Sequence, residues 1–166
     1  MWEGSVVSLH VAPAHGAPMT EVGEVLAVAG RGLMGDRYFR YFHDGAAGGP
    51  SRHVIGRSSG VCEISFIDVD ALTALKHDHG VFLASGEARR NVVCRGVPLD
   101  QLVGQELTVG ADVRVRGTAL SEPCARLERL TRPGVLRGLL HRGGLRAMIV
   151  SGGVLRIGDP VRLGRL

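Results

Sequence analysis

The residue with the clearest chemical potential in this chain is Cys124, which directly follows a proline in the stretch SEPCARLE. A helix is expected to begin here, and the free N–H groups at a helix N-terminus stabilise a thiolate. Arg126 or Arg129 would add to this effect if their side chains face the sulfur. A thiolate attacks sulfur, binds soft metals and carries a persulfide. The bland alternative is a small buried side chain that fills a gap.

The helix is expected over residues 124–130, with Ser121 or Glu122 as its cap and Pro123 in its first turn. The other two cysteines, Cys62 and Cys94, lie in the apolar strand-like runs GVCEISF and NVVCRG, so we interpret them as structural. Three cysteines without CxxC spacing argue against a disulfide framework and a zinc knuckle. We therefore expect a reducing, cytoplasmic location.

A second candidate element is GLMGDR, residues 32–37, which belongs to the glycine-rich connection GRGLMGDRYFRYFHDGAAGGPSRH. Gly35 would let backbone N–H groups approach an anion, and Asp36 with Arg37 could grip a ligand. The stretch is not a P-loop, because GK[ST] is absent. A tight turn held by an internal Asp–Arg pair explains the pattern equally, so both interpretations stay open.

Two arginine motifs follow later in the chain. In EARRNVV, Arg89 and Arg90 stand beside Asn91 at the entrance of a strand. Because neighbouring side chains in a strand point to opposite faces, we expect only one of the two arginines to face any pocket. In HRGG, Arg142 is expected at a helix end beside Gly143. Each motif taken alone is also compatible with solvated charges.

The charge of the chain is unevenly distributed. Residues 1–80 carry a net charge of −3 and residues 81–166 a net charge of +7, with Lys76 as the only lysine. Arginine offers a planar fork that suits phosphate and other oxyanions. A basic β-barrel that binds nucleic acid is the alternative, but the aromatics that would stack on bases cluster at residues 38–42. A pyridoxal phosphate enzyme is disfavoured, because Lys76 lies on an expected surface helix.

Length and turn signals predict one mostly-β domain over residues 1–166. Strands are expected over 6–11, 24–29 and 61–67, and again in the arginine-rich second half. Helices are expected from an Asp68 cap to His79, stopped by Gly80, and over 124–130 and 134–141. The apolar runs are too short to cross a membrane. Many short strands with few helices favour a barrel.

In order along the chain, these pieces resemble the MOSC domain, named after the C-terminal domain of molybdenum cofactor sulfurase, and in particular its small stand-alone bacterial members. The matching stretches span about residues 9–163: HVAPAHGAPM, GRGLMGDRYF, EARRNVV, LVGQELTVGADV, SEPCARLE, HRGGLRAMIVSGG and IGDPVRL.

The resemblance implies a MOSC-like β-barrel and a positively charged pocket for molybdenum cofactor, a molybdopterin. It implies that Cys124 is a molybdenum ligand or a persulfide carrier. It places the pocket wall at three motifs: Gly35, Asp36 and Arg37; Arg89, Arg90 and Asn91; Arg142, Gly143 and Gly144.

Two activities follow from the resemblance: reduction of N-hydroxylated compounds such as base analogues, or sulfur transfer through a persulfide. The first needs an electron-transfer partner and the second a sulfur-donor protein, because the chain shows no flavin, haem or iron–sulfur motif. Two alternatives remain, namely a nucleic-acid-binding barrel without catalysis and a structural protein in which Cys124 is inert.

Overall fold

The computed structural model describes residues 1–39 and 62–164 of the chain. The described strands are β1 Glu3–Val11, β2 Thr20–Val22, β3 Glu24–Val28, β4 Gly32–Leu33, β5 Ile64–Asp68, β6 Val92–Arg95, β7 Glu106–Val109, β8 Val113–Leu120, β9 Leu145–Ser151, β10 Gly153–Arg156 and β11 Pro160–Leu163. The described helices are α1 Val69–His79, the short 3-10 helix η1 Leu99–Gln101, α2 Ala125–Leu130 and α3 Val135–Gly138.

Seven of these strands close into a mixed barrel. Their order is β11–β7–β8–β9–β5–β6–β1, and β1 pairs back onto β11 with Glu3 opposite Arg162. The pair β5–β6 is parallel, and the other pairs in the barrel are antiparallel. β2 extends β1 outside the closed ring, and β10, β3 and β4 form a second small sheet. The expected mostly-β barrel is therefore confirmed.

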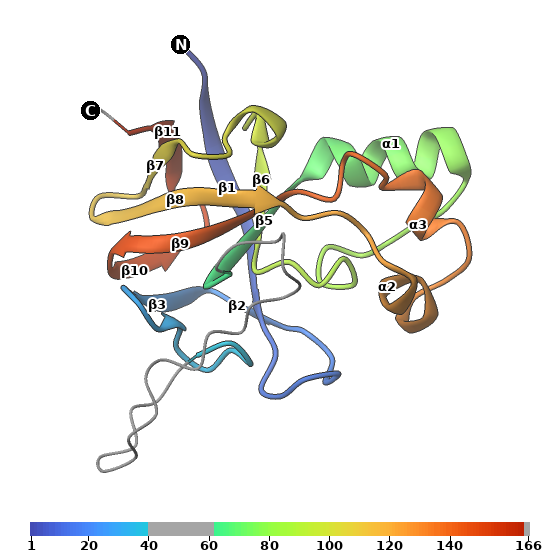
Figure 1. Cartoon of the computed structure of the whole chain (residues 1–166), viewed down its shortest axis with the longest axis horizontal. Coiled ribbons are helices and arrows are strands. Elements are labelled where there is room, and N and C mark those ends of the chain that lie inside the picture. The colour runs from blue at the N-terminus through green and yellow to red at the C-terminus, as the bar shows by residue number, and fades with distance from the viewer. Residues whose placement is uncertain (40–61, 165–166) are drawn as a thin grey trace.

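Alternation along the strands builds two cores. In β6, Val92 and Cys94 belong to the core inside the barrel, whereas Val93 belongs to a second core. In β5, Phe66 points inward and Ile67 outward. The second core lies between the barrel wall and the α-helices α1, α2 and α3, which gather on one side of the barrel (Figure 1). The outer face of the barrel on this side carries the candidate site.

Helix α1 begins and ends where the sequence predicts. Asp68 caps it by accepting a hydrogen bond from the N–H of Asp70 at 2.8 Å. Gly80 ends it in the left-handed conformation, with φ of 65°, which glycine adopts without strain. None of the helices in the described part of the chain has the length and apolar character of a membrane span.

The third helix differs from its prediction. α3 covers only Val135–Gly138, because the chain must then turn to bring two glycines against the barrel. A Cβ on Gly143 would overlap the carbonyl of Ser121, and one on Gly144 would overlap the carbonyl of Phe66. The close approach leaves no room for side chains. Residues 40–53 of the glycine-rich connection and Val61 of the strand expected over 61–67 lie outside the described residues.

Candidate functional site

A cavity of about 220 Å³ opens beside the start of α2 on the helical side of the barrel. We call it the arginine cavity, because five arginines from four separate segments line it together with Cys124. The arginines are Arg37, Arg89, Arg90, Arg126 and Arg146. Of the two arginines expected near the sulfur, Arg126 lines the same cavity as Cys124 and Arg129 does not.

Cys124 is exposed and lines this cavity. It is itself the N-cap of α2, with φ of −133° and ψ of 165°, and its side chain makes no capping hydrogen bond. The predicted cap was wrong: the chain is still extended at Cys124, so Pro123 precedes the helix instead of entering it. Glu122 instead accepts a hydrogen bond from the N–H of His141 at 3.0 Å.

Arg90 is the most constrained of the arginines. Its guanidinium donates to the carbonyls of Gly143 at 2.9 Å, Ser121 at 3.1 Å and Ala88 at 3.2 Å. Burial, followed by the charge of Arg146, lowers the pKa of Arg90 to about 10. Neutral carbonyls orient this charge but do not neutralise it.

Arg89 lines the same cavity as Arg90, so the expectation that only one of them would do so was wrong. Strand alternation does not apply, because Arg89 lies before β6 and has a left-handed backbone with φ of 59°. Its guanidinium donates to the carbonyl of Ala17 at 2.8 Å. Burial, and then the charges of Arg37 and Arg126, lowers the pKa of Arg89.

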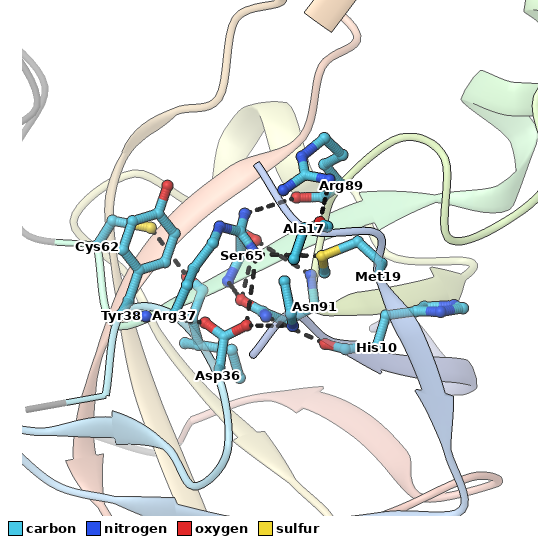
Figure 2. Close-up of polar contacts among 12 residues, drawn as sticks. His10, Ala17, Met19, Asp36, Arg37, Tyr38, Cys62, Ser65, Arg89 and Asn91 are labelled. Atoms are coloured by element: carbon cyan, nitrogen blue, oxygen red, sulfur yellow. Dashed lines mark hydrogen bonds and ion pairs between the residues drawn. The ribbon is translucent and has the colours of Figure 1, made fainter. Parts of the chain in front are cut away.

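Asp36 and Arg37 form the internal pair that the GLMGDR turn suggested. The Asp36 side chain is fully buried and accepts hydrogen bonds from the N–H groups of Ala12 at 2.9 Å and Tyr38 at 3.3 Å. Arg37 lies 3.4 Å from the same carboxylate, donates to the carbonyl of Arg89 at 3.3 Å, and covers the Tyr38 ring (Figure 2). Asp36 therefore fixes the loop, and Arg37 is the residue of this pair that lines the cavity.

Of two further predicted residues, Asn91 supports the site through the scaffold and Gly35 does not line it. The Asn91 side chain is buried, donates to the carbonyl of His10 at 3.1 Å and accepts from the N–H of Ser65 at 3.1 Å (Figure 2). It braces β1 and β5 at the entrance of β6. Gly35 lies in an exposed turn with φ of 85°, outside the lining of the cavity.

The Arg-Gly-Gly motif is divided between two places. The Gly143 carbonyl holds Arg90, so this glycine supports the arginine cavity. Arg142 instead lines a different depression with Asp68 and Asp100, and its guanidinium lies 3.6 Å from the Asp78 carboxylate.

Sequence reasoning missed Arg146, which lies on β9 and lines the cavity. The signal was present in LRAMIVS, because Leu145 and Ala147 are buried in the barrel and the residue between them must face outward. His15 and Tyr38 were also missed; both line the cavity, and their rings meet edge to face at 5.6 Å.

The cavity carries an excess of positive charge. Among the described residues, no carboxylate lies within ion-pair distance of Arg89, Arg90, Arg126 or Arg146. Glu122 also lines the cavity, but its carboxylate is directed to His141. Clustered, partly buried cations repel one another, and a bound anion relieves that repulsion. The arrangement can therefore hold an oxyanion beside an exposed thiol.

The architecture is a MOSC-like barrel, and solved structures share it. No protein-family model and no curated protein matches the sequence. The YuaD protein from Bacillus subtilis superimposes with a TM-score of 0.76 at 16% identity, covering 97% of each chain. YiiM from Geobacillus stearothermophilus gives a TM-score of 0.67 at 16% identity, covering 98% of this chain and 75% of that one. YiiM from Escherichia coli gives 0.64 at 13% identity, covering 100% and 71%. At such identities the likeness establishes the fold.

Proposed function

We propose that this protein binds a molybdenum cofactor in the arginine cavity and uses Cys124 for sulfur chemistry at the metal. One observation carries the proposal: four arginines without a carboxylate partner in the described chain surround an exposed thiol. The molybdenum cofactor carries a phosphate on its molybdopterin and a metal that is bound through sulfur. The guanidinium forks suit the phosphate, and the thiol suits the metal. The donor set therefore fits this group.

Each residue has a distinct part in that proposal. Arg89, Arg126 and Arg146 attract and orient the anionic ligand, and Arg90 fixes the wall between Ser121 and Gly143. Cys124, which is exposed and lines the cavity, would supply the sulfur ligand or carry the persulfide. When bound, the cofactor supplies a metal that changes oxidation state by two electrons.

Two reactions are compatible with these parts. In the reductase, an N-hydroxylated compound takes up two electrons and two protons, its N–O bond breaks, and an amine and water are released. A separate electron-transfer protein must supply the electrons. In the sulfur carrier, the Cys124 thiolate attacks the outer sulfur of a persulfide on a sulfur-donor protein, whose S–S bond breaks and which leaves as a thiolate. The Cys124 persulfide then gives up its outer sulfur in the same way and returns to the thiolate. Both need a free thiol, as in a reducing cytoplasm.

The deciding experiment is purification from a host that makes molybdenum cofactor, followed by assays of metal, oxidised pterin fluorescence and cyanide-labile sulfur. We expect the wild type to carry pterin. Stoichiometric molybdenum favours the reductase, and cyanide-labile sulfur without metal favours the carrier. Cys124→Ala should lose the metal or the labile sulfur, whereas Cys94→Ala, which alters a buried thiol in the barrel core, should keep them.

Wild-type protein without pterin, metal or labile sulfur would contradict the proposal. Salt-sensitive binding to oligonucleotides that survives Cys124→Ser would instead support the nucleic-acid-binding barrel. A Cys124 thiol that reacts no faster than a model thiol at neutral pH would support the inert role.

A further inference from the structure

A second concave region lies on the other side of Arg89. This outer groove has a volume of about 560 Å³ and shares Arg89, Gly16 and Leu130 with the arginine cavity. Its volume is typical of pockets that bind small molecules. Its floor comes from β1 and β2 and its rim from residues 84–87, so different side chains determine what it can bind.

The floor of the outer groove carries a cross-strand pair of polar side chains. His10 on β1 lies directly opposite Glu21 on β2, and both residues line the groove. Side chains of directly opposed residues point to the same face of a sheet. The His10 ring points away from Asn91, whose side-chain amide donates to the backbone carbonyl of His10 (Figure 2).

His10 is buried yet incompletely bonded. Only 3% of the residue is exposed, and its Nε2 lies 2.9 Å from the Ser8 hydroxyl. Burial lowers the pKa of His10, against the opposing effect of Glu21, so the imidazole is neutral at neutral pH. We assign the single ring proton to Nε2, which leaves a lone pair on Nδ1. No described residue donates to Nδ1, and Gly86 approaches it so closely that an added Cβ would be 3.1 Å away.

The carboxylates of the groove are not equivalent. Glu87 is paired with Arg132 at 2.7 Å and also accepts a hydrogen bond from the N–H of Ala84 at 2.7 Å. Glu21 makes no hydrogen bond or ion pair within the described residues. The floor thus presents one unpaired carboxylate and one imidazole acceptor, beside the apolar side chains of Pro18 and Met19.

We propose that the outer groove is a binding site for a small organic cation, such as an amidine, guanidine or amine attached to an apolar body. The N–H donors of the cation bond to the Glu21 carboxylate and His10 Nδ1, and its apolar body packs on Pro18 and Met19. This site does not depend on the proposed function, because neither His10 nor Glu21 lines the arginine cavity.

The test uses benzamidine as the probe and benzamide, its neutral analogue of the same shape, as the control ligand. Binding is measured by calorimetry, and the ¹⁵N shifts of the His10 ring are followed in parallel. We expect benzamidine to bind more tightly than benzamide and to shift the Nδ1 resonance. Equal affinity for the two ligands, or no detectable binding of benzamidine, would overturn the proposal.

Two variants locate the site. Glu21→Gln removes the charge from an exposed side chain and should weaken benzamidine binding by about three- to tenfold without changing the melting temperature. Glu24→Gln makes the same charge change outside the groove, where Glu24 faces Arg156, and should leave the affinity unchanged. Gly86→Ala crowds Nδ1 and should also weaken binding. If Glu21→Gln and Glu24→Gln bind benzamidine equally well, the proposed site is wrong.

Discussion

Replacing Arg146 by methionine should stabilise the protein while weakening its hold on anions. Arg146 lies on β9, its guanidinium faces no carboxylate within the described residues, and its charge is the largest effect after burial on the pKa of Arg90. Methionine keeps much of the apolar length of the side chain and removes only the charge. Most substitutions destabilise a protein, so a gain in stability would be a specific signature of repulsion.

The size of the expected gain in stability follows from the pKa of Arg90. A fall in its pKa from the ordinary value of arginine to about 10 means that keeping this group charged in the folded state costs about 3 kcal/mol. The unfolded chain binds the proton more tightly, so the cost is fully present below about pH 10 and disappears as the pH rises toward the ordinary pKa of arginine. Burial accounts for the largest part. Removing Arg146 should therefore restore on the order of 1 kcal/mol at pH 8.

The assay is urea unfolding at pH 8 in dilute chloride buffer, with and without inorganic pyrophosphate. We expect Arg146→Met to have a higher midpoint than the wild type without pyrophosphate, and a smaller gain when pyrophosphate is added. The control is Arg156→Met, which removes an exposed arginine paired with Glu24 and should leave the pyrophosphate effect intact. The reasoning is refuted if Arg146→Met is no more stable than Arg156→Met and keeps the full pyrophosphate effect.

Two further predictions concern residues around the cavity. Iodoacetamide should label the native protein at Cys124 alone, because Cys62 and Cys94 are buried and burial raises the pKa of both thiols. Mass spectrometry of the labelled peptides checks this, and equal labelling of all three cysteines would contradict the burial. Asp36→Asn should lower the free energy of unfolding by about 2 kcal/mol, because it alters a buried acceptor of backbone N–H groups, whereas Asp100→Asn on the surface should change that free energy little. The urea midpoints of the two variants are compared, and equal effects would show that Asp36 does not fix its loop.

Local patterns predicted much of the fold. The Asp68 cap and the Gly80 stop gave α1 its observed bounds, because capping depends on residues adjacent in sequence. The alternating runs gave strands close to β1 and β3. The pairing of β1 with both β6 and β11 could not be predicted, because strand register depends on contacts between distant segments.

The candidate site was predicted less completely. The prediction of a helix start at Cys124 was close to the observed start of α2, but it did not identify Cys124 as the N-cap. The alternation of side chains along a strand did not apply to Arg89, because its left-handed backbone turns the chain before β6. Arg146 lies on a strand that only the closed barrel brings beside Arg90. Its place in the arginine cavity therefore depends on tertiary structure and could not be predicted from the local sequence.

The pairing of β1 with β11, which closes the barrel, constrains how the chain folds during synthesis. Because Glu3 lies opposite Arg162, the ring of strands cannot close until β11 has left the ribosome. Pairings this remote in sequence slow the search for the native state. We expect a nascent chain that ends before β11 to remain open along β1 and β7, and such an intermediate would be a natural client for chaperones.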